Sequence, residues 1–151
     1  MTDQSKTIDT LNDLIEASKD GEYGFKASAE QAKSPELKSM LSARASECRS
    51  AAQELQALVS RLGGKAEDDG SMLGAMHRGW VSVKTALTSH DDLAVLEECE
   101  RGEDSALESY RDALKMELTP EARTLVDQQY AGAKRNHDEI RRRRDALKMK
   151  N

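Results

Sequence analysis

Aromatic residues, prolines and cysteines are all scarce in this chain. One Trp, one Phe and three Tyr occur among 151 residues, which leaves little material for a β-sheet, since strands are rich in aromatic and β-branched side chains. Only two prolines interrupt a sequence dominated by Ala, Leu, Glu, Lys, Arg and Gln, the residues that lose least on entering a helix. A chain of this length suits one hydrophobic core. We therefore expect an all-α protein with a single domain over residues 1–151.

Long apolar runs and a broad basic surface are also absent. No stretch approaches the roughly 20 apolar residues that a membrane-spanning helix needs, and the polar N-terminus does not resemble a secretion signal. The net charge of −5 is spread through segments of mixed sign, so we expect no nucleic-acid face. Four consecutive arginines, Arg141 to Arg144, would point all round a helix and form a solvated helix end. The sequence predicts a cytoplasmic protein that binds neither membranes nor nucleic acid.

Two cysteines, Cys48 and Cys99, lie far apart in the sequence. They do not form the Cys-x-x-Cys spacing of zinc or redox sites, so we expect free, buried thiols.

Apolar residues at steps of three and four predict four long helices. The expected ranges are about 5–33, 35–62, 91–117 and 120–148. Pro35 and Pro120 suit the first position of a helix, and the hydroxyl residue before each is a good cap. Gly63 and Gly64 suit a left-handed helix end. Two hairpins joined by a long connection are the arrangement of ferritin-like four-helix bundles, in which the second and third helices run parallel.

The connection over residues 64–90 carries its own helical pattern. Met72, Met76 and Trp80 share one apolar face, which predicts a short helix at about 71–88 lying along the bundle. The alternative for this face is a docking surface for a partner, because methionine-rich faces adapt to varied partners.

The two predicted hairpins also align with each other in sequence. Residues 16–32 shifted by 81 positions align Glu22 with Glu103, and residues 35–54 shifted by 85 align Pro35 with Pro120. The repeat predicts one glutamate on the apolar seam of each hairpin.

A carboxylate on an apolar seam needs a partner, because its desolvation costs several kcal/mol. We expect Glu22 and Glu103 to approach each other at the bundle axis, where either a metal ion or arginines would neutralise them. Pairing the first two helices around their turn places Glu47 beside Glu22. Carboxylate-bridged di-iron bundles add a Glu-x-x-His pair on each of two helices, and this chain has Ser50 and Arg135 where those histidines would be.

His137 borders the apolar stripe of the fourth helix. Pairing the last two helices around their turn places it near Glu98 to Glu100, where it would act as an outer metal ligand, as a partner for Glu100, or as a hydrogen-bonded core histidine. The metal-free alternative has Arg49 and Arg135 swinging inward to pair with the two seam glutamates.

The chain resembles the ferritin-like superfamily, and more closely a bacterial group of ferritin-like four-helix proteins described as a domain of unknown function. The residues that carry the resemblance are Asp20-Gly21-Glu22-Tyr23-Gly24-Phe25, Glu47, His77-Arg78-Gly79-Trp80, Glu100-Arg101-Gly102-Glu103-Asp104 and Asn136-His137-Asp138. It implies a ferritin-like bundle, in a superfamily whose true ferritins and oxidases bind two irons and react with oxygen or peroxide.

Two functions follow from these patterns. The first is a metal-associated or stress-related protein with oxygen ligands from Glu22, Glu47 and Glu103 and a nitrogen ligand from His137, a set that suits iron or manganese. Because the fourth helix lacks the required ligands, we expect no efficient oxidase turnover, and the sequence favours a non-enzymatic protein. The second is a helical scaffold with core Glu–Arg pairs and no metal, acting through self-association or a protein partner.

Overall fold

The structure is a computed structural model that describes residues 3–66 and 91–150. Within these ranges it contains four α-helices and no strands, as the composition predicts. The helices are α1 (Asp3–Gln31), α2 (Pro35–Arg61), α5 (Asp92–Leu114) and α6 (Pro120–Lys150). The predicted short helix at about 71–88 lies outside the described residues.

Local signals in the sequence set the helix ends. The Ser34 side chain accepts a hydrogen bond from the backbone nitrogen of Leu37, 3.3 Å away, directly before Pro35. Asp91 caps α5 in the same way through the backbone nitrogen of Leu93. Gly63 follows α2 with φ of +82°, the left-handed conformation that glycine adopts without strain.

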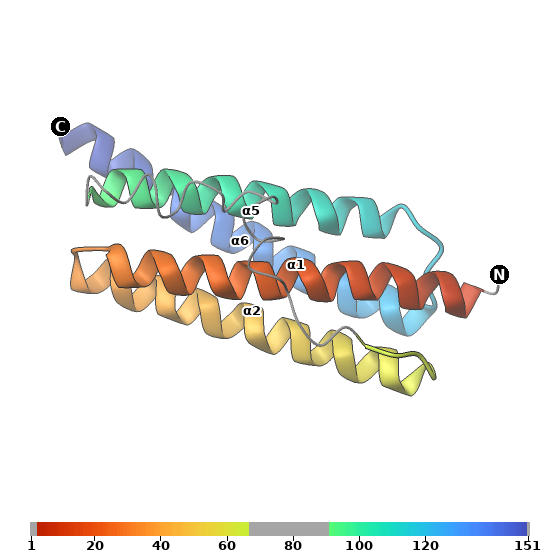
Figure 1. The fold of residues 1–151 in the computed structure, drawn as a ribbon. Helices are drawn as coiled ribbons and strands as arrows, with labels where there is room; N and C mark the ends of the chain where they lie inside the picture. Colours follow the sequence, from red (N-terminus) through yellow and green to blue (C-terminus); the bar gives the residue numbers. More distant parts are fainter. Residues whose placement is uncertain (1–2, 67–90, 151) are drawn as a thin grey trace.

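The helices form two antiparallel hairpins that pack side by side (Figure 1). The backbone nitrogens of Lys33 and Ser34, at the end of α1, donate to the Asp92 carboxylate at the start of α5. At the other end of the bundle, the backbone nitrogen of Thr119 donates to Thr7 near the start of α1. Therefore α1 and α5 are antiparallel, and α2 runs parallel to α5.

The hydrophobic core is divided into two clusters, and all four helices contribute to each. One cluster comprises Phe25, Ala29, Ala32, Leu37, Leu41, Ala45, Val95, Leu96, Cys99 and Ile140. The other comprises Leu11, Leu14, Ile15, Leu55, Leu58, Val59, Tyr110, Ala113, Ala122 and Val126. Between them the inward-facing positions are small or polar, so the middle of the bundle is where a site can form. None of the described helices combines the length and apolar character needed to span a bilayer.

Candidate functional site

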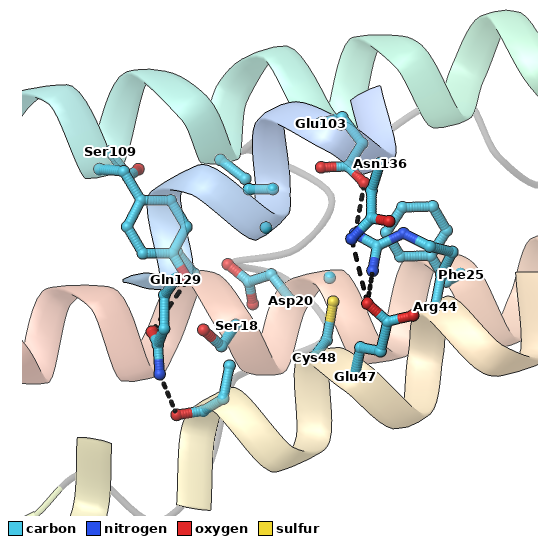
Figure 2. Close-up of a pocket in the computed structure, with 18 of the residues that line it drawn as sticks. Ser18, Asp20, Phe25, Arg44, Glu47, Cys48, Glu103, Ser109, Gln129 and Asn136 are labelled. Carbon is cyan, nitrogen blue, oxygen red and sulfur yellow. Dashed lines mark hydrogen bonds and ion pairs between the residues drawn. The ribbon is translucent and has the colours of Figure 1, made fainter. Parts of the chain in front are cut away.

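A cavity of about 300 Å³ lies in the middle of the bundle, and all four helices line it (Figure 2). The space is unfilled because small residues occupy inward-facing positions where a tightly packed bundle would have leucines. The small residues on the walls are Ala17, Gly21, Ala51, Gly102, Ala106, Gly132 and Ala133. Its polar side chains include carboxylates, one guanidinium, amides and hydroxyls, so the cavity combines apolar walls with a few polar groups, as small-molecule sites do.

A buried ion pair crosses one end of this cavity. Arg44 Nη2 on α2 donates to Glu103 Oε1 on α5 at 2.6 Å, with side chains 9% and 2% exposed. Arg44 Nη1 donates to Glu47 Oε2 at 2.7 Å. The guanidinium therefore lies between two carboxylates (Figure 2). The prediction that Glu103 is buried and paired with a cation is confirmed.

The Arg44 guanidinium is also held by an aromatic ring. Its central carbon lies 5.1 Å from the centroid of Phe25 on α1, within cation–π range. The remaining donor, Nε, is buried and has no hydrogen-bond partner among residues 3–66 and 91–150. A buried donor without a partner costs free energy, and this one lies in a side chain on the cavity wall.

Two amides of α6 connect it to α2 along the cavity. Asn136 Nδ2 donates to Glu47 Oε2 at 3.0 Å, and Gln129 Nε2 donates to Glu54 Oε1 and to the Ala51 carbonyl oxygen, each at 3.2 Å. The Tyr110 hydroxyl donates to Gln129 Oε1 at 3.1 Å and so fixes the amide's orientation. The two bridges are seven residues apart on each helix, or about 10 Å. We call the stretch between them the α2–α6 portal.

Glu22 does not lie in the central cavity, contrary to the prediction that it meets Glu103. Its side chain is 23% exposed, pairs with Arg49 Nε at 3.0 Å, and lines a separate groove between α1 and α2. The reason is the close approach of the two helices at Gly21, where an added Cβ would lie 3.0 Å from Cys48 Sγ. With Gly21 facing α2, the next residue points about 100° away. The repeat therefore does not give equivalent environments to Glu22 and Glu103.

The predicted pairing of α1 with α2 is confirmed by the Gly21–Cys48 and Phe25–Arg44 contacts, which place Glu47 level with Glu22, but the two side chains face different sides of the hairpin. The Glu47 side chain lines the cavity, is 55% exposed and bonds to Arg44 and Asn136, whereas Glu22 lines the groove bordered by Ser46 and Arg49. The two glutamates therefore lie in different depressions.

His137 is buried, and its Nε2 lies 2.6 Å from Asp104 Oδ1. The prediction that it pairs with Glu98 to Glu100 is wrong. Glu100 instead pairs with Arg144. The prediction assumed a constant pairing counted from the turn, whereas the observed contacts Tyr110–Gln129, Asp104–His137 and Glu100–Arg144 shift progressively from that pairing along the helices.

The arginine alternative is correct for one pair and wrong for the other. Arg49 pairs with Glu22 as predicted, but Arg135 is exposed and Arg44 is the partner of Glu103. A signal for Arg44 was present, because position 44 fills the gap in the α2 stripe between Leu41 and Cys48. A charged residue at such a position is a candidate for a buried ion pair. Gln129 and Asn136 gave no comparable signal.

The four residues predicted to bind iron or manganese are not brought together. Glu103 and Glu47 hold Arg44 between them, Glu22 faces another groove, and His137 bonds to Asp104. Among the residues that the structure describes, no group of three or more His, Cys, Asp or Glu side chains is arranged to hold a metal ion. As arranged, this donor set does not fit a carboxylate-bridged centre, and the metal site stays a prediction.

Burial raises the pKa of three groups in the core of the bundle, Glu103, Cys48 and Cys99. Desolvation raises the pKa of Glu103 above its usual value, although Arg44 opposes the shift. Desolvation also raises the pKa of Cys48 and Cys99 to about 12. Both cysteines are free, as predicted, and at neutral pH they are thiols rather than reactive thiolates.

The arginine run at the end of α6 forms ion pairs within α6 and with Glu100 on α5. Arg142 and Arg143 contact Glu139, and Arg144 contacts Glu100 and Asp145. These contacts match the expected solvated helix end.

A comparison with protein families finds a match over most of the chain. The model of the family described as "Domain of unknown function (DUF2383)" matches residues 6–116, which include α1, α2 and α5 and therefore both Arg44 and Glu103. No curated protein matches the chain.

Proposed function

We propose that this chain, which belongs to the DUF2383 family, is a ferritin-like bundle that binds a small molecule in its central cavity without catalysing a reaction. The observation that carries the proposal is the cavity itself, about 300 Å³ in volume and lined by four helices. That volume lies at the lower end of the range for small-molecule pockets.

The position of the cavity supports this function. It lies between the two apolar clusters, and ferritin-like bundles likewise build their metal sites in the bundle core from inward-facing side chains. Here Arg44 supplies the positive charge between Glu47 and Glu103 that an ion would supply. The carboxylates are thus neutralised in part, while space remains beside them for a ligand.

The two free thiols support a non-catalytic role and a location inside the cell. The raised pKa of Cys48 and Cys99 keeps both protonated at neutral pH, so neither is activated as a nucleophile. Free thiols are typical of a reducing compartment. We therefore include cytoplasmic localisation in the proposal.

Cavity filling tests this function. Ala51 lines the cavity from α2, and Ala43 is exposed on the same helix, so Ala51→Leu and Ala43→Leu form a matched pair with equal helix propensity. The probes are benzyl alcohol, benzylamine and benzoate, three molecules of similar size, with dissociation constants measured by ligand-observed NMR. We expect at least one probe to bind the wild type and Ala43→Leu equally and Ala51→Leu at least about tenfold more weakly. Binding of no probe, or equal binding to both variants, would contradict the proposal.

A further inference from the structure

The hydrogen-bond capacity left over in the cavity is mostly that of acceptors. Glu47 uses only Oε2, Glu54 only Oε1 and Glu103 only Oε1 in the bonds described above. Asn136 turns its amide nitrogen to Glu47, because a carboxylate only accepts, and its Oδ1 accepts no bond within residues 3–66 and 91–150. Four acceptor oxygens on the lining therefore remain available, and Arg44 Nε is a buried donor that also remains. The hydroxyl and amide groups of Ser18, Ser105 and Gln128 can both donate and accept, so they do not change this bias.

Negative charges also outnumber positive charges on the cavity lining. Glu47, Glu54 and Glu103 face one lining cation, Arg44, which leaves two uncompensated negative charges. Asp20 also lines the cavity but has interactions of its own, so it is left out of this count. Counting the exposed Arg135, which lies beside Gly132, still leaves the carboxylates in excess. An anionic ligand is disfavoured, and a cation is attracted.

The portal places two of these carboxylates at its ends. Glu47 and Glu54 are both exposed on α2, one at each α2–α6 bridge, and Glu103 lies inside on α5. Between the bridges the lining is small, with Cys48 and Ala51 on α2 and Gly132 and Ala133 on α6. A ligand entering here passes between two carboxylates before it reaches a third.

We propose that the cavity selects a small organic cation, specifically a protonated amine with an apolar body, which enters through the α2–α6 portal and donates hydrogen bonds to Glu47 and Glu103, while Glu54 adds a second negative charge at the other end of the portal. The ammonium group meets the acceptor oxygens, and the apolar body packs against Ala17, Ala106 and Ala133. A ligand that also carries an acceptor satisfies Arg44 Nε. This assignment rests on the proposed binding function and names its ligand class.

The test compares charge at constant size. Benzylamine is the cation, benzyl alcohol the neutral analogue and benzoate the anion. In wild-type protein, calorimetry at neutral pH should give benzylamine an affinity at least about tenfold above that of benzyl alcohol, as expected for hydrogen bonds to charged groups, with benzoate the weakest.

The portal glutamates provide the matching variants. The double substitution Glu47→Gln, Glu54→Gln keeps an acceptor oxygen for each amide bridge and removes both charges. We expect it to lower benzylamine affinity by about tenfold and leave benzyl alcohol unchanged. Glu108→Gln, on an exposed position of α5, makes an equal charge change per site outside the lining and should leave both affinities unchanged. Thermal melts of each variant establish that it is folded.

The outcomes separate the two proposals. Equal affinities for benzylamine and benzyl alcohol, both weakened by Ala51→Leu, would overturn the cation class and leave the cavity function intact. Benzylamine binding that survives Ala51→Leu would place the amine on the surface and overturn this inference. Failure of every probe to bind would overturn both.

Discussion

Arg44 on α2 and Glu103 on α5 form a 2.6 Å ion pair across the diagonal of the bundle. These helices are not adjacent, since α1 packs against both and α6 packs against both. A side chain that reaches across the bundle axis fixes the separation of the helices and keeps the middle from collapsing into a packed core.

Breaking this pair should be costly. Arg44→Met leaves Glu103 buried without a cation, and we expect a loss of about 3 kcal/mol or more in the free energy of unfolding. Arg49→Met breaks the more exposed pair with Glu22 and should cost under about 1 kcal/mol. Urea denaturation measures both, and equal losses would contradict the buried character of Arg44–Glu103.

Removing both charges should recover the stability. Arg44→Met combined with Glu103→Leu replaces the pair by apolar side chains, and such replacements of buried ion pairs are often neutral or stabilising. We expect the double variant to be more stable than Arg44→Met alone. If the double variant is the less stable of the two, Glu103 has another cationic partner.

The buried Glu98 carboxyl should make the free energy of unfolding depend on pH. Burial raises the pKa of this carboxyl above its usual 4.5, with Arg101 opposing and Glu97 reinforcing the shift, and its Oε2 has no hydrogen-bond partner within the described residues. A raised folded-state pKa means that the folded protein binds more protons than the unfolded chain above pH 4.5, so stability falls as pH rises through the folded-state value. Glu98→Gln should remove this part of the loss and be more stable than wild type at pH 7. Denaturant midpoints between pH 4.5 and 7 provide the measurement, and a destabilised variant at pH 7 would refute the assignment.

Metal addition tests the iron or manganese site. A resident metal would raise stability by about 2.7 kcal/mol at a concentration 100-fold above its dissociation constant. Because Arg44 lies between Glu47 and Glu103, we expect Fe²⁺ and Mn²⁺ to leave the melting temperature unchanged. Glu103→Gln and Glu22→Gln are the comparison variants, and a metal-dependent rise in wild type that Glu103→Gln abolishes would establish the metal site instead.

Gly63 should tolerate asparagine better than alanine. Its φ of +82° costs an L-residue about 1 kcal/mol, and asparagine adopts this conformation more readily than alanine. We expect Gly63→Ala to lower the free energy of unfolding by about 1 kcal/mol and Gly63→Asn by less. Equal losses in urea denaturation would mean that backbone conformation is not the cause.

Prediction from the sequence succeeded for features that neighbouring residues determine, such as the ends of helices. Ser34 before Pro35 and glycine at position 63 mark helix ends through capping and backbone conformation, which depend only on neighbouring residues. The apolar stripes likewise identified the four helices that the structure describes. The burial of Glu103 followed from its position on such a stripe.

Prediction from the sequence failed where the rotation or shift of one helix against another determines which side chains meet. Glu22 lies one residue from the seam, and only the close packing of Gly21 against Cys48 determines which of the two residues faces inward. His137 was assigned to the wrong partner because the pairing of α5 with α6 shifts progressively along the two helices and differs by about one turn at this position from a count made at the connection. Arg44 was visible as a charge in an apolar stripe, but its reach across the bundle is a property of the tertiary arrangement.

The two-part core has a mechanical consequence. Each apolar cluster draws on all four helices, so neither end can loosen by peeling one hairpin from the other. The waist between them is held by the Arg44 bridge and two amide links, with empty volume in place of interlocking side chains. Within the described residues, small displacements of one helix against another should therefore be accommodated at the cavity more easily than in either packed cluster.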